Sequence, residues 1–154
     1  MDIKIRNARP DDLDAMTDLL QELFSIEADF EVDEQRQHRG LSMMLDGCRK
    51  HRCVQVAESE GMVVGMATGQ MLVSTAEGGM VALIEDMVVH GPYRGAGIGR
   101  MLMESVASWA RRRGATRLQL LADRTNFQAL DFYDKIGWHP TKLICLRRKW
   151  NEKK

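Results

Sequence analysis

A glycine-rich run has the residue types and spacing that hold a phosphate group. It consists of Arg94, Gly95, Ala96, Gly97, Ile98 and Gly99, between an apolar stretch and an amphipathic one. Glycines at alternate positions let a backbone turn tightly and approach a ligand without a Cβ in the way. A helix that starts there points its unpaired N–H groups and its positive dipole end at the ligand. The run therefore predicts an anion site, and we expect a pyrophosphate.

Spacing excludes the two common nucleotide loops. A Walker loop ends in Gly-Lys-Ser/Thr, and the chain has no Gly-Lys pair. A dinucleotide fingerprint counted from Gly95 and Gly97 needs glycine where Arg100 stands. The spacing that remains, Arg94-x-x-Gly97-x-Gly99, resembles the acyl-CoA-binding signature of the GNAT superfamily of N-acetyltransferases.

A second segment supports the same resemblance. Asn126, Ala129, Tyr133, Gly137 and Trp138 have the spacing Asn-x-x-Ala-x-x-x-Tyr-x-x-x-Gly-Trp, which is similar to the next element of that family. A tight strand-to-helix turn could explain the glycines alone. Two motifs in the right order favour the family over that explanation.

The resemblance implies a fold and a cosubstrate. The fold would be α/β, of the mixed α+β kind, with a mostly antiparallel sheet of six or seven strands and helices on both faces. The fourth and fifth strands would part like a V, and the pantetheine arm of acetyl-CoA would lie in that opening. Backbone groups of Met87, Val88 and Val89 would bind the arm, and the amides of residues 94–99 the pyrophosphate. Asn126 would contact the arm or the phosphates.

The chemistry of amide formation points to carboxylates before the loop. A lysine-like amine has a pKa of about 10.4, so only roughly one molecule in a thousand is neutral at pH 7. Glu85 and Asp86 precede the loop, where similar proteins carry an acid that contacts or deprotonates the acceptor. Alternation puts only one of them in the cleft. We favour Glu85, because Ile84 and Val88 share the other parity, although a bulge would reverse the choice and either acid could merely position substrate.

Tyr133 is the candidate acid for the departing sulfur. A thiolate of pKa near 8.5 would take its proton from a tyrosine of pKa near 10, which is about 2 kcal/mol uphill. The alternative is a packed aromatic whose hydroxyl reaches the surface. Asn126 precedes Tyr133 by seven residues, so the two would share a helix face about 10 Å apart.

Periodicity supplies the elements that position these residues. We expect a strand over Ile3–Ala8, a helix from Pro10 to about Ile26, and a second helix with Leu41, Met44, Leu45 and Cys48 on one face. A hairpin over 53–58 and 62–73 leads to a strand over 81–89. A helix then follows, and Gly114 ends it. Its apolar stripe contains Ile98, Met101, Leu102, Ser105, Val106 and Trp109. Leu118, Leu120 and Ala122 predict the next strand.

Composition limits the partners. The 154 residues predict one domain, 1–154, and the 22 basic and 22 acidic side chains balance. Nothing therefore favours capture of nucleic acid or of an anionic membrane. Cys48, Cys53 and Cys145 lack metal-ligand spacing, as do the scattered histidines, so we predict no metal. The start of the chain carries no export signal, which favours the cytoplasm.

The acceptor is less defined than the donor. We expect a small-molecule amine or a peptide amine that attacks acetyl-CoA directly in a ternary complex, because no cysteine lies in either motif. Acids between Glu22 and Glu34 would suit a cationic amine if they line the cleft. The basic end, Arg147–Lys149 with Lys153 and Lys154, could bind an acidic partner or the ribose phosphate of CoA, or be solvated. A homodimer is common in the family.

Two alternatives stay open. A non-catalytic acyl-CoA-binding regulatory module would keep Arg94 to Gly99 but would not need Glu85 or Tyr133. A phosphate-binding nucleotide protein would be stabilised by ATP and not by CoA.

Overall fold

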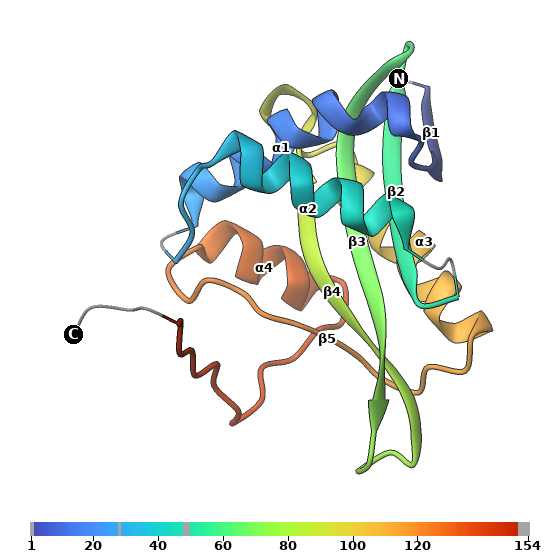
Figure 1. Ribbon diagram of the computed structural model, residues 1–154, viewed down its shortest axis with the longest axis vertical. Helices are drawn as coiled ribbons and strands as arrows, with labels where there is room; N and C mark the ends of the chain where they lie inside the picture. Colours follow the sequence, from blue (N-terminus) through green and yellow to red (C-terminus); the bar gives the residue numbers. More distant parts are fainter. Residues whose placement is uncertain (1, 28, 48–49, 151–154) are drawn as a thin grey trace.

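Five strands form one sheet in the order β1-β2-β3-β4-β5 in the computed structural model, which describes residues 2–27, 29–47 and 50–150 (Figure 1). The strands are β1 (Ile3–Asn7), β2 (Arg52–Ser59), β3 (Met62–Ser74), β4 (Gly79–Val89) and β5 (Leu118–Leu120). The first four run antiparallel to their neighbours, and β5 pairs parallel to β4. The predicted α/β class, with a mixed and mostly antiparallel sheet, is confirmed.

The helices cover both faces of the sheet. They are α1 (Leu13–Ile26), α2 (Glu34–Asp46), α3 (Ile98–Arg112) and α4 (Phe127–Lys135), with 3-10 turns at Pro10–Asp12 and Gly91–Tyr93. Helices α1 and α2 lie side by side across one face, and α3 lies behind the sheet (Figure 1). The first helix ends at Ile26, as its periodicity predicts. The second helix contains Gly40 and ends at Gly47, while Cys48 lies outside the described residues.

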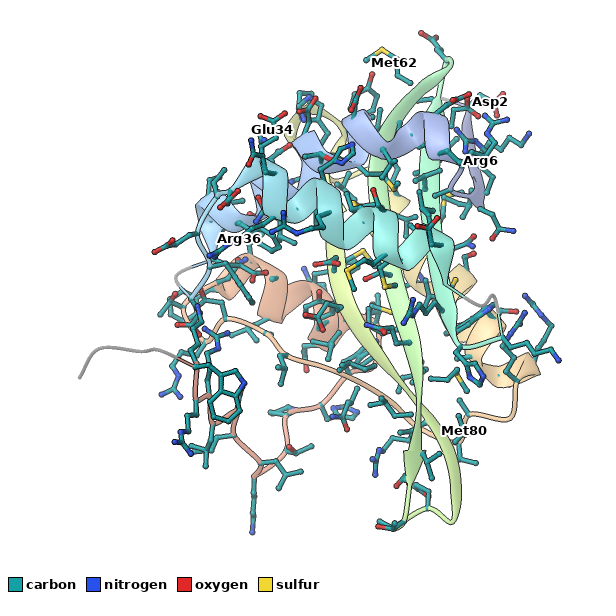
Figure 2. The ribbon with its side chains drawn as sticks, in the orientation of Figure 1. Asp2, Arg6, Glu34, Arg36, Met62 and Met80 are labelled. Atoms are coloured by element: carbon teal, nitrogen blue, oxygen red, sulfur yellow. The ribbon has the colours of Figure 1, made fainter. Side chains whose placement is uncertain are left out.

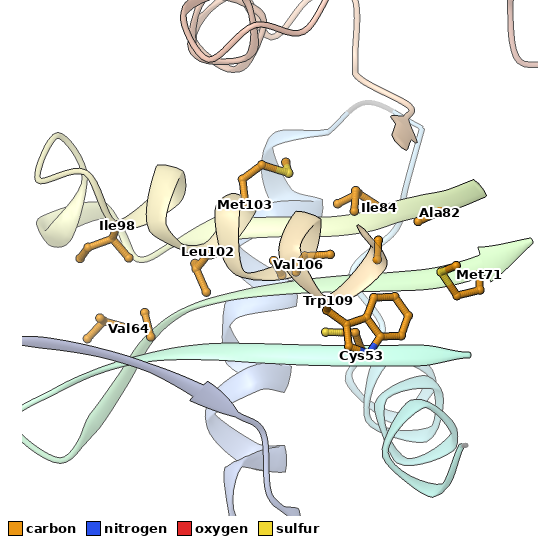
Figure 3. Packing of buried hydrophobic residues seen from close by; sticks show 13 residues of the cluster. Cys53, Val64, Met71, Ala82, Ile84, Ile98, Leu102, Met103, Val106 and Trp109 are labelled. Carbon is orange, nitrogen blue, oxygen red and sulfur yellow. The ribbon is translucent and has the colours of Figure 1, made fainter. Parts of the chain in front are cut away.

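Each face has its own apolar cluster. On one face, Met16, Leu20 and Leu41 of the two N-terminal helices pack on Val56 and Met66 of the sheet. On the other, α3 presents Ile98, Leu102, Val106 and Trp109 to the sheet, together with Met103 (Figure 3).

The apolar stripe predicted for α3 is wrong at one position. Met101 is 38% exposed, whereas Met103 is buried. At about 100° per residue, the buried face is centred between Leu102 and Val106, and Met103 lies nearer to that centre than Met101. The stripe therefore extends toward Met103 and Ala110.

A buried ion pair attaches the first strand to the start of α1. The Arg6 Nη1 atom lies 2.7 Å from Asp12 Oδ2, and the Arg9 N–H donates to the same oxygen (Figure 2). These contacts hold the pKa of Asp12 below its usual range, because the hydrogen bond from Arg6 outweighs the effect of burial. The pair fixes where the helix begins relative to the sheet.

The C-terminal strands differ from the expectation. Over the described residues the sheet has five strands, not six or seven, and β5 ends at Leu120, before Ala122. β5 pairs with β4 only over Ala82–Ile84, and the next two residues of β4, Glu85 and Asp86, form a bulge against β3. Residues 139–149 form no strand, and Pro140 at their start has no N–H to donate to a ladder.

Candidate functional site

The fourth and fifth strands part where the site lies. Their parallel pairing ends at Ile84 and Leu120, while β4 continues to Val89 paired only with β3. The splay predicted between the fourth and fifth strands is therefore present. Over Glu85–Val89, the edge of β4 that faces β5 forms no ladder, so the backbone at Met87, Val88 and Val89 borders an open V. An extended ligand could pair there as an added strand does.

A β-bulge in β4 carries the two acidic candidates. Ala67 pairs with Met87 and Gly69 with Ile84, so one residue of β3 faces two residues of β4, Glu85 and Asp86. The bulge reverses the side-chain parity. Ile84 belongs to the cluster under α3, whereas Val88 belongs to the cluster under α1 and α2. The premise that Ile84 and Val88 face the same side is therefore wrong, and Glu85 and Asp86 line the same cavity.

Asp86 is the more deeply buried of the two acids. Thr68 donates its hydroxyl to Asp86 Oδ2 at 3.0 Å and accepts the Asp86 backbone N–H at 3.1 Å. Burial raises the pKa of Asp86 to about 6; the hydrogen bond from Thr68 opposes this rise and the charge of Glu85 adds to it. Asp86 is thus a carboxylate whose proton affinity is close to neutral pH, which suits a proton acceptor.

Glu27, directly after α1, is a second carboxyl with a high proton affinity. Burial raises its pKa to about 7, and the charges of Asp86, Asp123 and Glu85 add to the rise. The sequence places Glu27 only among the acids of a variable region, and no motif identifies it. Its coupling to Asp86 depends on how α1 packs on the sheet.

Tyr133 lies on the other side of these carboxyls. It projects from α4 onto the cluster under α3, with its ring 5.3 Å from that of Phe132 and 6.2 Å from that of Trp138. Burial raises its pKa to about 12, and the charge of Glu27 adds to the rise. Donation to a thiolate of pKa near 8.5 is then uphill by about 5 kcal/mol in this state. The tyrosine is better suited to hydrogen bonding than to full proton release.

The glycine-rich loop has the geometry of an anion cradle. Gly95 and Gly97 have φ of 81° and 83°, a left-handed conformation that other residues adopt only with strain. Gly97 is the N-cap of α3, and no side chain caps the first turn. The leading N–H groups of α3 are thus left for a ligand. Gly99 has a different role, because a Cβ there would meet the Phe132 ring at 3.1 Å.

The signature arginine is held by a glutamate of α1. Arg94 donates its Nε to the Val89 carbonyl at 2.8 Å and its Nη2 to Glu22 Oε1 at 3.2 Å. Glu22 also accepts the Gly91 N–H and lies 2.9 Å from His90 Nδ1. Burial tends to raise the pKa of Glu22, but the hydrogen bonds from His90 and Gly91 outweigh burial and lower it. Glu22 therefore anchors the start of the loop to α1, a role that no sequence motif indicates.

Asn126 caps α4 in the structure. Its Oδ1 accepts the Ala129 N–H at 3.1 Å, as an N-cap side chain does. Its NH2 group takes no part in this cap. Asn126 thus lies just before α4, which begins at Phe127, and Tyr133 lies within the helix, two residues before its end at Lys135.

A cavity of about 420 Å³ opens between α2 and the sheet, on the face away from α3. One wall carries Thr68, Gln70, Glu85 and Asp86. The rest of the lining is apolar or basic except for the amide of Gln37, and it comes from α1, α2 and β2: Leu20, Phe24, Arg36, Gln37, Gly40, Leu41, Met43, Met44 and Arg52. We call it the acceptor cavity after the amine acceptor that we propose for it, because Glu85 and Asp86 both line it.

Other predicted features lie away from the site or outside the described part of the chain. Arg147 stacks on Phe30 and donates to the Asp29 carbonyl, and Arg148 lies over Trp150, while Lys153 and Lys154 lie outside the described residues. In the part of the chain described, no three metal-ligating side chains gather. No helix there is long and apolar enough to cross a membrane.

Comparison with known proteins identifies the class. Residues 13–138 match the model of the acetyltransferase (GNAT) family, so the chain belongs to that family, which uses acetyl-CoA. An uncharacterized N-acetyltransferase of Archaeoglobus fulgidus is 32% identical over 137 residues, which cover 85% of this chain and 89% of that protein.

Solved structures share the fold. An acetyltransferase of Trypanosoma brucei superposes with a TM-score of 0.74 at 24% identity, covering 96% of this chain and all of that one. An aminoglycoside N-acetyltransferase in complex with CoA gives 0.80 at 17% identity, covering 97% and 95%. At these identities the likeness concerns the fold alone.

Proposed function

We propose that this acetyltransferase transfers the acetyl group of acetyl-CoA to a primary amine by direct attack in a ternary complex. The observation that carries the proposal is the pair of openings on either side of the β4 bulge. The V begins where the pairing of β4 with β5 ends at Ile84, and the acceptor cavity is lined by Glu85 and Asp86, the next two residues of the same strand. An amine in the cavity and a thioester in the V would meet at Glu85 and Asp86.

The donor side would be held mostly by backbone groups. Met87, Val88 and Val89 offer an open strand edge, and the first amides of α3 point at the end of the V where a pyrophosphate would lie. Gly95, Ala96, Gly97, Ile98 and Gly99 form this cradle, with Arg94 fixing its shape through Glu22. Asn126 has an NH2 group free of its cap for the arm of the cosubstrate.

Proton removal from the amine is assigned to the carboxyls on the cavity side. Asp86, with a pKa of about 6, is mostly ionised at pH 7, and Glu27, with a pKa of about 7, is half ionised. Both could accept a proton directly or through water. Glu85, the acid favoured by sequence, lies more exposed beside Asp86 and would align the ammonium group.

Tyr133 is assigned to the leaving sulfur. Its hydroxyl is protonated at neutral pH, because its pKa is raised to about 12. A hydrogen bond from it would stabilise the developing thiolate without transferring the proton fully. Among the described residues, Cys53 is buried in the core and Cys145 lies in the exposed C-terminal segment, so neither is assigned as a nucleophile.

The test is release of CoA thiol from acetyl-CoA over a panel of primary amines. We expect release with at least one amine, and Tyr133→Phe should lower kcat by about tenfold or more, because a hydrogen bond to developing charge is lost. Asp131→Asn, which breaks an exposed ion pair with Lys135 on the same helix, serves as the control. Tight CoA binding without release for any amine, and without change in the variant, would favour the non-catalytic acyl-CoA-binding module.

Association of two copies is part of the proposal. Leu143 and Leu146 are 85% and 86% exposed in a C-terminal segment that also exposes Ile144 and Trp150. The outer edge of β5 has no partner strand among the described residues. Such an apolar segment beside an open edge suits a second chain. Sedimentation velocity should show a dimer that Leu146→Asp converts to a monomer. A cytoplasmic location stays a prediction.

A further inference from the structure

The acceptor cavity carries opposite charges at its two ends. Glu85 and Asp86 lie on the wall formed by β4, next to the V. Arg52 begins β2 at the far side of the same cavity, and Arg36 lies in the first turn of α2 above it (Figure 2). Between them, Leu41, Met43 and Met44 make the α2 side of the lining apolar, while Thr68 and Gln70 lie on the sheet side. The occupant should therefore have two ends of different charge and an apolar middle.

The two arginines differ in how they are paired. Arg36 Nε lies 3.5 Å from Asp33 Oδ2, so its charge already has a carboxylate partner. Arg52 donates one N–H to the Met43 carbonyl at 3.0 Å, and no carboxylate of the described residues lies within ion-pair distance of it. Its side chain lies against Gly47, where a Cβ would overlap it. A guanidinium held in this way has donors left for a carboxylate.

The sheet register gives the separation of the two ends. Arg52 pairs with Gln70 of β3, and Asp86 lies opposite Thr68 of the same strand. Two strand spacings of about 4.8 Å and two residues of about 3.3 Å place the two backbones roughly 12 Å apart. Both side chains enter the cavity from this face of the sheet, so a separation of this order is spanned by a ligand chain of about four to six atoms with a hydrogen bond of about 2.9 Å at each end.

We propose that the acceptor is a short ω-amino carboxylate, with its amine at Glu85 and Asp86 and its carboxylate at Arg52. The proposal rests on the amine acetyltransferase function proposed above and names its substrate class. In the reaction the ammonium group first gives one proton to a carboxylate, and the neutral nitrogen bonds to the acetyl carbon. The carbon–sulfur bond breaks, CoA leaves as a thiolate hydrogen-bonded to Tyr133, and the second proton lost by the nitrogen passes to the sulfur to give the thiol. A diamine of the same length is disfavoured, because its second ammonium would face a guanidinium.

A matched set of acceptors tests the substrate class. The set is 5-aminopentanoate, pentylamine and 1,5-diaminopentane, assayed with acetyl-CoA by thiol release. We expect kcat/KM for 5-aminopentanoate to exceed both others by about tenfold or more, because a charge-assisted bidentate contact is made only by the carboxylate. Glycine, whose amine and carboxylate are too close to span the cavity, should be poor.

Two arginine variants locate the contact. Arg52→Gln should reduce the advantage of 5-aminopentanoate over pentylamine to less than threefold, whereas Arg36→Gln should retain it. Thermal unfolding of Arg52→Gln shows whether the end of α2 is kept, and Arg52→Lys should restore part of the preference through charge alone.

The outcomes separate the two proposals. Turnover of pentylamine or the diamine at a rate equal to that of 5-aminopentanoate would overturn the substrate class and leave the acetyltransferase function standing. An equal loss for all acceptors in Arg52→Gln would also overturn it, because the arginine would then be structural only. Absence of release with every amine would overturn the function and this inference together.

Discussion

The two sides of the splayed sheet are built in different ways. The proposed donor side, residues 87–99 with the start of α3, would bind its ligand through backbone amides, a strand edge and glycines of positive φ from one continuous stretch. The acceptor cavity relies on side chains from α1, α2, β2, β3 and β4. A ligand site made of backbone groups can be predicted from a short sequence motif. A cavity made of side chains depends on which distant segments pack together. The predictions below test this contrast.

The largest effect is expected on the acceptor side, at Asp86. Asp86→Asn removes the buried proton acceptor and should lower kcat/KM for the amine by about 100-fold, a typical loss for general base catalysis. KM for acetyl-CoA should change little, because the donor side does not use this side chain. Steady-state kinetics with each substrate varied checks both statements, and a loss confined to acetyl-CoA KM would contradict them.

The same substitution should stabilise the fold at high pH. The pKa of Asp86 is raised from 3.8 to about 6 in the folded chain, so the folded state holds more protons than the unfolded state between these values. The contribution of protonated Asp86 to the free energy of unfolding is therefore lost as the pH rises from about 4 to about 6. At pH 8 the free energy of unfolding of Asp86→Asn, measured by denaturant titration, should exceed that of the parent by up to about 3 kcal/mol. At pH 3.5 the two free energies of unfolding should be equal.

The pH dependence of the rate follows from the same carboxyls. With Asp86 near pKa 6 and Glu27 near pKa 7, kcat/KM for the amine should rise with pH and level off above about pH 7. Without an enzyme base, the rate would instead keep rising toward the amine pKa of about 10.4. Glu27→Gln should shift the rising limb toward lower pH.

On the donor side, Gly97 offers a paired test with Gly114. The two glycines lie at opposite ends of α3 with φ of 83° and 87°, and a Cβ at either would meet no atom within 4 Å. Alanine at either position should cost about 1–2 kcal/mol of stability through backbone strain. Only Gly97→Ala should also raise KM for acetyl-CoA, by about tenfold. Equal KM values for the two variants would show that the loop does not hold the cosubstrate.

The smallest effect is expected at Glu22, which supports the loop from α1. Glu22→Gln removes the ion pair with Arg94 but keeps an oxygen for the Gly91 N–H, so about 1 kcal/mol is at stake. KM for acetyl-CoA should rise by about fivefold with kcat nearly unchanged. Glu104→Gln breaks an exposed pair with Arg100 on α3 and serves as the matched control. A fall in kcat alone would assign Glu22 a different role.

Sequence reasoning performed well wherever the signal is local. The N-terminal helix, the hairpin and the helix after the loop all follow from periodicity and glycine positions, and α1 ends at Ile26 as expected. It failed where a neighbour decides the outcome. Met101 is exposed because the face of α3 that packs on the sheet includes Met103 instead. Ala122 forms no strand because β5 ends at Leu120, where its pairing with β4 stops.

The chain by itself determined the class of the fold and the donor side, because glycines of fixed spacing, an uncapped helix start and alternating strands are properties of neighbouring residues. The tertiary structure decided the acceptor side. The offset between Ala67 and Gly69 of β3 turns Glu85 and Asp86 to the same face, and the docking of α1 places Glu27 near them. A register shift depends on which strand lies alongside, and this is information that no single segment contains.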